Sequence, residues 1–311
     1  MKIVVAGGSG FLGKSLQKHW EEQGHRVVNL SRKPISKNDV FWDGLTLGAW
    51  LDVLEGASVL VNLSGKSVDC RYSDVNKQEI YESRIITTQL LEEALKSVAN
   101  PPKLWINASS ATIYIHAESQ QMNEEGGILG DDFSMNICKE WEKAFFSEDV
   151  SRIRKVAVRS SIVLGNEGGA FPKMKTIARI GLGGYQGNGN QLISWIHIVD
   201  FCKALDYIIQ HEDLVGSINV TAPVPVTNKL FMQELRTKLG VPFGINTPIF
   251  VLELASILMQ TETELLLKSR NVVPEKLLNH GFIFEYPVIQ KAIEHLIQAL
   301  VKKRSCKKCG V

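Results

Sequence analysis

The sequence predicts an α/β protein: a Rossmann-type, doubly wound parallel sheet with a smaller, mostly helical C-terminal substrate lobe. Short apolar stretches alternate with amphipathic helical stretches, a glycine-rich turn follows the first of them, and this alternation is lost near the C-terminus. We expect residues 1–165 to form the Rossmann domain, with 195–222 returning to it. Residues 166–194 and 223–300 are then the substrate lobe, and 301–311 a basic tail.

The individual elements follow from periodicity and from turn residues. The run KIVVAG is rich in β-branched residues, as buried parallel strands are. The stretch after it places Leu12, Leu16 and Trp20 at helical spacing and stops at Gly24. By the same reasoning we expect strands at 2–7, 25–32, 58–65, 103–110, 154–165 and 216–223, and helices at 11–24, 73–98 and 133–146. Residues 181–191 are predicted to form a flexible glycine-rich loop, 192–210 a strand or turn and then a helix, and 227–300 mostly helix.

Composition narrows the class of protein. Of 311 residues, 44% are apolar and 22% charged, as in soluble globular proteins. The net charge of +2 gives no electrostatic reason to expect a nucleic-acid partner. Apolar runs fall far short of the roughly 20 residues that span a bilayer, so we expect no membrane partner. The apolar N-terminal stretch is too short for a signal peptide, and a cytoplasmic location is expected by elimination. Homo-oligomerisation stays open.

The cysteines do not suggest a disulfide framework or a metal site. There are five of them, Cys70, Cys138, Cys202, Cys306 and Cys309, an odd and scattered set that we expect to be reduced thiols. The last two form a lone CxxC with no second pair, whereas a structural zinc site needs four ligands. We therefore predict no metal and a frayed basic tail, in which the role of the two cysteines stays open.

A phosphate-binding turn is indicated by the stretch AGGSGFLG. Its three glycines have the spacing GxxGxxG, directly after a strand and at the start of a helix. Glycines allow the backbone to approach a pyrophosphate, whose charge is met by the free amides of the helix N-terminus. The sequence thus predicts a dinucleotide site whose contacts are Gly7, Gly10, Phe11, Leu12 and Gly13.

The end of the second predicted strand favours NADP(H) over NAD(H). A carboxylate there would bond the ribose 2′-hydroxyl of NAD, but this chain has Ser31, Arg32 and Lys33. Ser31 can hydrogen-bond a 2′-phosphate, and Arg32 can clamp it or stack on the adenine; a solvated surface turn is the alternative. The third strand ends at Leu63 and Ser64, which we expect beside the adenine and ribose.

Several further stretches carry a resemblance to a known family. They are LSRKP, VNLSGKSV, ESRIITTQLL, CKEWE, VRSSIVLGNEGGAFPKM, GLGGYQGNGNQLISWIHIVD, NVTAPVPVTN and VVPEKLLNHGFIFEYP, which with GGSGFLG cover nearly the whole chain in order. With them the chain resembles the atypical, extended short-chain dehydrogenases/reductases of the NAD-dependent epimerase/dehydratase superfamily. More narrowly, it is similar to the subfamily called epimerase family proteins.

The resemblance implies catalysis by a serine, a tyrosine and a lysine. In catalytic relatives the tyrosine exchanges a proton with the substrate hydroxyl, the lysine lowers the tyrosine pKa and holds the nicotinamide ribose, and the serine bonds the substrate oxygen. Ser110 and Lys139 match the serine and the lysine, but Met135 stands at the tyrosine position. Methionine has no titratable proton, so standard tyrosine-assisted hydride transfer is not expected. The narrower subfamily generally lacks this tyrosine too.

Other residues could replace the tyrosine or line the cofactor pocket. Tyr114, shortly after Ser110, is a candidate acid, with a packing role as the alternative. His116 is another candidate because histidine is a common acid or base near neutral pH, with an ordinary loop residue as the alternative. The resemblance also implies that Glu79 and Arg84 line the NADP pocket; each could instead be an exposed helix charge. His197, in the string SWIHIVD, is more typical of structural support than of substrate contact.

Two functions therefore remain open. The first is an NADP(H)-dependent oxidoreductase or epimerase-like enzyme acting on a small hydroxyl or carbonyl substrate, with Ser110, Lys139 and Tyr114 as catalytic candidates. The second is a regulatory or sensor protein that binds NADP(H) without turnover, which Met135 favours. Substrate, reaction direction and proton donor are not predicted.

Overall fold

The computed structural model describes residues 1–147, 152–253 and 267–308, and side chains up to residue 299. The chain divides into two compact units. Unit 1 comprises Met1–Ile113, Leu129–Ser160 and Cys202–Asn219; unit 2 comprises the remaining segments, Tyr114–Ile128, Ser161–Phe201 and Val220–Val311.

Unit 1 is built on a seven-stranded sheet with the order β10-β6-β5-β4-β1-β2-β3. Neighbouring strands pair in parallel, with Val4 opposite Val28 on one side and Leu60 on the other. This sheet confirms the predicted Rossmann-type fold. The strands are β1 (Lys2–Ala6), β2 (Arg26–Ser31), β3 (Asp39–Phe41), β4 (Val59–Asn62), β5 (Leu104–Ser110), β6 (Arg154–Ser160) and β10 (Gly216–Val220).

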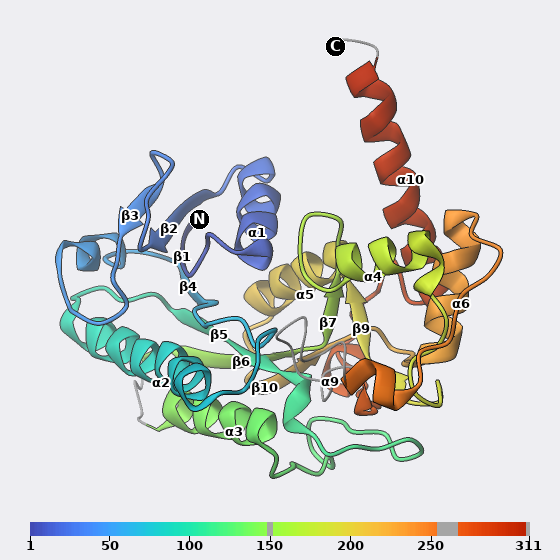
Figure 1. Cartoon of the computed structure of the whole chain (residues 1–311). Helices are drawn as coiled ribbons and strands as arrows, with labels where there is room; N and C mark the ends of the chain where they lie inside the picture. Colours follow the sequence, from blue (N-terminus) through green and yellow to red (C-terminus); the bar gives the residue numbers. More distant parts are fainter. Residues whose placement is uncertain (148–151, 254–266, 309–311) are drawn as a thin grey trace. The chain divides into compact units, whose positions relative to one another are not determined.

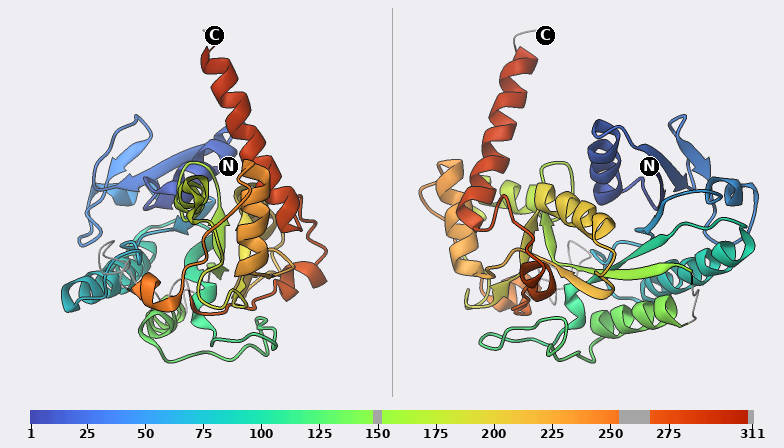
Figure 2. Two further views of the ribbon diagram at one scale, coloured as in Figure 1. Left: turned by 45° about the vertical axis from the view of Figure 1, so that its right-hand side comes forward. Right: turned by 180° about the vertical axis from the view of Figure 1, so that it is seen from behind.

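Helices cover both faces of this sheet. Figures 1 and 2 show α2 and α3 on one face and α1 and α5 on the other. A core of strand residues packs with apolar residues of α2, α3 and η1, among them Leu91, Phe145 and Trp50. The helices are α1 (Phe11–Glu22), η1 (Ala49–Val53), α2 (Asp74–Ser97), η2 (Ala111–Ile113), α3 (Phe133–Phe146) and α5 (Ile198–Gln210), the last of which begins in unit 2.

Unit 2 combines two small sheets with helices. Strand β7 (Ile162–Leu164) pairs in parallel with β9 (Trp195–His197), and β8 (Leu192–Ile193) pairs antiparallel with β11 (Val226–Thr227). Their core includes the fully buried Trp195 and Phe231. The helices are α4 (Phe171–Ile177), η3 (Ala178–Leu182), α6 (Asn228–Leu239), α9 (Glu275–Asn279) and α10 (Ile289–Lys308).

The structure departs from the sequence expectations at several places. Strand β3 and the helices η1, α4 and η3 were not predicted, and the strand expected at 154–165 is divided into β6 and β7. The loop 181–191, expected to be flexible, exchanges backbone hydrogen bonds with residues 245–247, including Ile245 N to Gly181 O at 2.9 Å. Between 227 and 300 the described chain is less helical than predicted, since 241–248 and 280–288 contain no helix. The predicted fraying is wrong for 301–308, whose backbone continues α10; Cys309 lies outside the described residues.

Within the described ranges, no helix is both long and apolar enough to cross a membrane. The same residues contain no group of histidine, cysteine and carboxylate side chains arranged to hold a metal ion.

Candidate functional site

The turn between β1 and α1 requires glycine for steric reasons. Gly7 has a φ of +75°, and a β-carbon there would lie 2.9 Å from the Cα and N atoms of Ser64. A β-carbon on Gly13 would overlap the carbonyl oxygen of Gly8. Both glycines therefore allow backbone segments to come closer than any other residue would permit. The turn is thereby held tight against the end of β4.

The N-terminus of α1 opens directly from this turn. Gly10 is the N-cap and makes no side-chain capping hydrogen bond. The first helical hydrogen bond runs from Lys14 N to Gly10 O at 2.9 Å, so the amides of Phe11, Leu12 and Gly13 have no acceptor within the helix. The positive end of the helix dipole adds to these free donors. This arrangement suits a phosphate group.

The tip of β2 presents the residues expected at a ribose 2′-phosphate. The hydroxyl of Ser31 donates to Lys33 O at 3.2 Å and accepts from Lys33 N at 3.1 Å, which closes a tight turn. Arg32 in this turn is exposed and makes no hydrogen bond or ion pair with the described residues. Its five donors are therefore available to an anion.

A buried polar network fixes the end of β4. Asn62 is fully buried; its amide donates to Asn107 Oδ1 at 2.7 Å, and its side-chain oxygen accepts from Ser64 N at 3.0 Å. Leu63 N donates to Ala6 O at 2.9 Å. The Ser64 hydroxyl is buried and has no hydrogen-bond partner among the described residues. A buried hydroxyl without a partner indicates room for a further acceptor or donor.

Glu79 and Arg84, both on α2, differ in their surroundings. Glu79 forms an ion pair with Lys66, whose ammonium also donates to Asn76 Oδ1 at 2.6 Å. The Arg84 guanidinium lies against Gly65, stacks over the Trp141 ring at 5.1 Å and donates to Ile80 O at 3.0 Å.

Burial disfavours the charged form of the Arg84 guanidinium. It lowers the pKa of the guanidinium, with smaller opposing effects from nearby cysteine and tyrosine groups. No carboxylate forms an ion pair with Arg84 within the described ranges. A partly buried cation without a carboxylate partner is a suitable contact for an anionic ligand.

Ser110 and Thr112 form a hydroxyl pair at the end of β5. Ser110 Oγ donates to Thr112 Oγ1 at 3.0 Å and accepts from Thr112 N at 3.1 Å. These bonds hold the serine in one rotamer. Both residues are half-buried, so a substrate oxygen could reach either hydroxyl.

Helix α3 carries Lys139 and the unexpected Met135. The Lys139 ammonium lies 2.5 Å from Asp131 Oδ1, an exposed carboxylate. Met135 is 2% exposed, and its sulfur packs so closely on Gly130 that a β-carbon there would overlap it. Gly130 is in turn joined to η2, because its N–H donates to Ile113 O at 3.0 Å. The position expected for a catalytic tyrosine is therefore filled by apolar packing.

Tyr114 and His116 belong to unit 2. The Tyr114 ring is fully buried and packs against Gly127, where a β-carbon would overlap it. His116 accepts a hydrogen bond from Ser269 N at 3.0 Å through Nδ1, and its ring is half exposed. Because Nδ1 accepts, a neutral His116 carries its proton on Nε2.

His197 also lies in unit 2 and is completely buried. Its Nδ1 accepts from Val199 N at 3.1 Å, and its Nε2 lies 3.1 Å from Nδ1 of His295. Burial, and then the neighbouring His295, lower the His197 pKa to about 3. A histidine that stays neutral and is enclosed by protein groups fits the structural role expected for it.

Some residues of the site were not predicted from the sequence. They are Thr112, Asp131 and Trp141, the partners of Ser110, Lys139 and Arg84. Thr112 stands two positions after Ser110, a spacing typical of hydroxyl turns. The other two contacts depend on how α2, α3 and the preceding loop pack, for which the sequence contains no local signal.

Two family profiles match the chain. The NAD dependent epimerase/dehydratase family matches residues 3–133. A domain of unknown function, DUF1731, matches residues 247–296.

Similar proteins extend over almost the whole chain. The human epimerase family protein SDR39U1 is 31% identical over 300 residues, which cover 96% of this chain and 100% of the relative. Epimerase family protein YfhF of Bacillus subtilis is 33% identical over 301 residues, covering 96% and 98%.

Solved structures show the same fold. Human SDR39U1 (isoform 2), crystallised with NADPH, has a TM-score of 0.87 at 31% identity, covering 96% of this chain and 99% of that one. A nucleoside-diphosphate sugar epimerase from Corynebacterium glutamicum has a TM-score of 0.78 at 30% identity, covering 96% and 58%.

Proposed function

Because this chain belongs to the epimerase family proteins of the NAD-dependent epimerase/dehydratase family, we propose that it is an NADP(H)-dependent oxidoreductase or epimerase-like enzyme. Its substrate is a small molecule with a hydroxyl or carbonyl group. Two features together carry the proposal. The glycine turn packs closely against Ser64, and the exposed Arg32 side chain at the tip of β2 makes no hydrogen bond or ion pair with the described residues.

The residues of unit 1 fit a dinucleotide phosphate. The Gly7 turn gives backbone clearance, the amides of Phe11, Leu12 and Gly13 face outward along the helix axis, and the buried Ser64 hydroxyl lacks a partner. Arg32 offers a planar set of donors to a 2′-phosphate, and no carboxylate at the tip of β2 would repel it. The presence of NADPH in the structure of human SDR39U1 supports the same choice of nucleotide.

When bound, the cofactor would supply hydride-transfer chemistry, with NADPH as the donor or NADP⁺ as the acceptor, and the protein would position the reacting groups. The Ser110–Thr112 pair would hydrogen-bond the substrate oxygen. Lys139 would leave the exposed Asp131 to bond the nicotinamide ribose, which is inexpensive because surface ion pairs contribute about 0–1 kcal/mol. Met135 cannot transfer a proton, so water or another side chain would serve as acid.

A second candidate is a regulatory or sensor protein that binds NADP(H) without turnover. The burial of Met135 and of the Tyr114 ring favours this function, because neither side chain is available to exchange a proton with a solvent-facing substrate. The two functions share the cofactor site and differ only in turnover.

A substrate screen separates the two functions. NADPH oxidation would be followed spectroscopically with a panel of small aldehydes, ketones and quinones, using the wild-type protein and Ser110→Ala. Enzymatic function predicts oxidation of NADPH by the wild type and a loss of about 10²–10³-fold in the variant, as for removal of an oxyanion donor. NADPH binding without oxidation across the panel would favour the sensor.

A further inference from the structure

Helix α10 continues past the part of it that packs in the core of unit 2. Its residues Ile289, Ala292, Ile293 and Leu296 are buried in that core. They are three or four residues apart and so form one stripe along the helix. The helix nevertheless runs on to Lys308. Figures 1 and 2 show its last turns, in red, extending beyond the other elements of unit 2.

Cations replace the apolar stripe of α10 in this distal part. Continued at the same spacing, the stripe passes through Leu300, then Lys303 and Arg304, and then Lys307. Lysine and arginine are almost never fully buried without a partner. Residues 301–308 of α10 are therefore not suited to extending the core of unit 2.

The basic residues of this segment repel one another along the helix. Five of them fall within seven positions: Lys302, Lys303, Arg304, Lys307 and Lys308. Two pairs are four residues apart, Lys303 with Lys307 and Arg304 with Lys308. Like charges at this spacing destabilise a helix, and residues 295–311 contain no aspartate or glutamate to offset them. An anionic partner outside the helix would remove this repulsion.

The helix dipole accounts for only part of this charge. Cations stabilise the C-terminal end of a helix, but the effect is confined to the last turn. That turn contains Lys307 and Lys308. Lys302, Lys303 and Arg304 precede it, so their positive charge needs another explanation.

Charge is distributed unequally between this segment and the rest of the chain. The whole chain has a net charge of +2, to which the five basic residues contribute +5, so the other residues sum to −3. An anionic surface therefore attracts this end of α10 and weakly repels the remainder of the chain. The attraction is specific to one segment.

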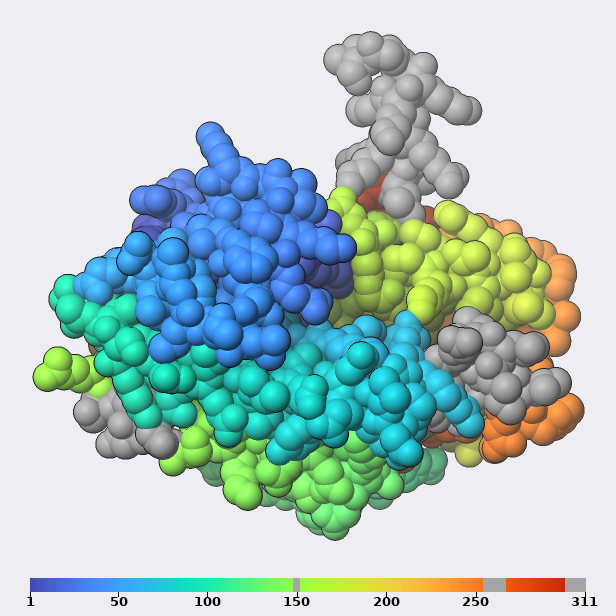
Figure 3. All heavy atoms as spheres, turned by 60° about the vertical axis from the view of Figure 1, so that its left-hand side comes forward, coloured from blue at the N-terminus to red at the C-terminus, as the bar shows by residue number. Residues whose placement is uncertain are grey.

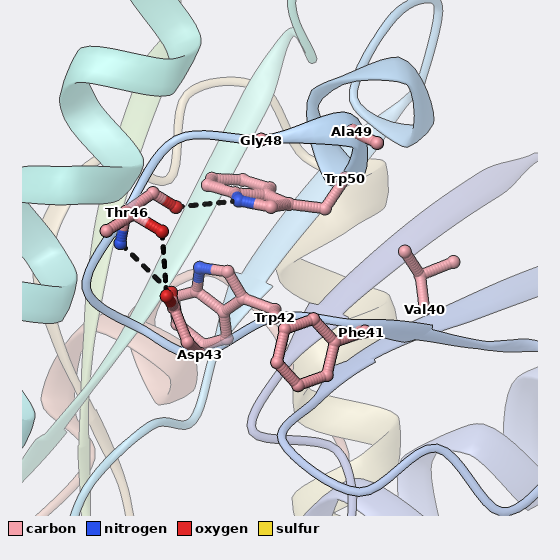
Figure 4. A pocket seen from close by; sticks show the side chains of 8 residues that line it. All are labelled: Val40, Phe41, Trp42, Asp43, Thr46, Gly48, Ala49 and Trp50. Carbon is pink, nitrogen blue, oxygen red and sulfur yellow. Dashed lines mark hydrogen bonds between the residues drawn. The ribbon is translucent and has the colours of Figure 1, made fainter.

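The pocket beside β3 offers no comparable site for an anion. Figure 4 shows its lining, which comes from β3 and the loop to η1 and surrounds about 240 Å³. The charged residue of this lining is Asp43, whose carboxylate accepts from Thr46 N at 2.9 Å and from Thr46 Oγ1 at 2.7 Å. The blue segment that contains the pocket lies at the surface in Figure 3. A carboxylate here disfavours anions, so the pocket does not compete with α10 for an anionic partner.

We propose that residues 301–308 of α10 bind the surface of a membrane that contains anionic phospholipids. Clusters of about four to eight lysines and arginines on a helix are typical of such binding. Leu300 and Val301, directly before the cations, are residues of the kind that enter the headgroup region of a bilayer. A nucleic-acid partner is not favoured, because residues 287–311 contain no Phe, Trp or Tyr on which bases could stack.

This attachment is to the surface of a bilayer and needs no spanning helix. It agrees with the absence of such a helix from the described residues. It revises the expectation that the chain has no membrane partner, which was drawn from the length of apolar runs alone. The inference does not depend on the proposed function.

Vesicle flotation tests the inference with the full chain. The vesicles consist of phosphatidylcholine alone or of phosphatidylcholine mixed with phosphatidylglycerol. The proteins are the wild type, Lys303→Gln/Arg304→Gln and the matched control Lys18→Gln/Lys143→Gln. The control removes the same charge from two exposed lysines of unit 1. Glutamine is as good a helix former as lysine, so the helix itself is retained.

The wild type is expected to bind the anionic vesicles and not the neutral ones. Each Lys or Arg near an anionic surface strengthens binding about fivefold, so Lys303→Gln/Arg304→Gln weakens it about 30-fold. Lys18→Gln/Lys143→Gln binds as the wild type does. Salt at about 1 M, where the Debye length is about 3 Å, releases the wild type from the vesicles.

Three results would overturn the inference. They are a wild type that binds neither kind of vesicle, equal binding to both kinds, and unchanged binding by Lys303→Gln/Arg304→Gln. Fluorescence anisotropy with a double-stranded DNA fragment at the same salt is run in parallel; binding of DNA without binding of anionic vesicles also overturns it. A thermal unfolding scan identifies any misfolded variant, in which case the salt dependence of the wild type decides the result.

Discussion

The sulfur of Met135 packs against the backbone of Gly130, and the methionine is 2% exposed. Gly130 is hydrogen-bonded to Ile113 in η2, which directly follows Ser110 and includes Thr112. The position at which a catalytic tyrosine was expected is thus part of the packing between α3 and η2. A tyrosine here would have no room for its hydroxyl without displacing this backbone.

Replacing Met135 by tyrosine should therefore destabilise the protein instead of supplying an acid. Overpacking a tight core position typically costs about 1–3 kcal/mol. Urea unfolding of Met135→Tyr measures this loss, and Met135→Leu, similar in volume, is the control and should lose less than about 1.5 kcal/mol. A stable Met135→Tyr variant with increased NADPH oxidation would contradict this account of the position.

Gly7→Ala should abolish nucleotide binding, whereas Gly24→Ala should not. Both glycines have positive φ, +75° and +79°, so both substitutions strain the backbone by a similar amount. Only at Gly7 does the added methyl meet the backbone of Ser64, since nothing lies within 4 Å at Gly24. NADPH titration of the two variants checks this difference. Equal affinities would show that the turn does not contact the nucleotide.

Breaking the buried ion pair between Glu142 and Arg159 should be strongly destabilising. Two Arg159 nitrogens donate to the Glu142 carboxylate at 2.7 Å each, and Ser109 and Ser217 complete its hydrogen bonds. Glu142→Ala leaves the guanidinium buried without its partner, which costs about 3–5 kcal/mol. The exposed neighbour Glu140→Ala is the control and should change the free energy of unfolding by about 0.5 kcal/mol or less. Urea unfolding measures the free energy of unfolding of both variants, and an equal decrease in Glu142→Ala and Glu140→Ala would contradict this prediction.

Stability should fall with acidification because of His197. Its folded pKa of about 3 lies below the ordinary value of 6.5, so between these pH values the unfolded chain binds a proton that the folded chain does not. Stability is then lost as pH falls through this window, at a rate of up to about 1.4 kcal/mol per pH unit. Urea unfolding of the wild type and His197→Gln from pH 7 to pH 4 measures this loss of stability. If the free energy of unfolding changed with pH in the same way in both proteins, this would contradict the burial of a neutral imidazole.

Local elements were predictable from the sequence, and contacts between elements were not. The strand–turn–helix unit around Gly7 has a local signature, because a β-branched run, a glycine turn and a 3.6-residue apolar period follow one another. Strand β3 was missed because its three residues begin with an aspartate and show no alternation. Its pairing with β2 decides its structure, and that pairing is not local.

The same difference between local patterns and contacts between elements holds for the candidate site. Ser31 and Arg32 could be proposed from their place after a predicted strand. The packing of Tyr114 on Gly127 and the stacking of Arg84 on Trp141 are contacts between residues that are not neighbours in the sequence. The exposure of Phe41 was not predictable either, because a lone phenylalanine in a sequence does not reveal whether its ring is exposed.

The most direct test of the central claim is a fluorescence titration of NADPH and NADH into the wild type and Arg32→Ala. The account predicts that the wild type prefers NADPH, and that the variant loses affinity for NADPH by about tenfold or more while its affinity for NADH is little changed. Equal affinity of the wild type for both nucleotides, or an Arg32→Ala variant that keeps the preference for NADPH, would contradict it.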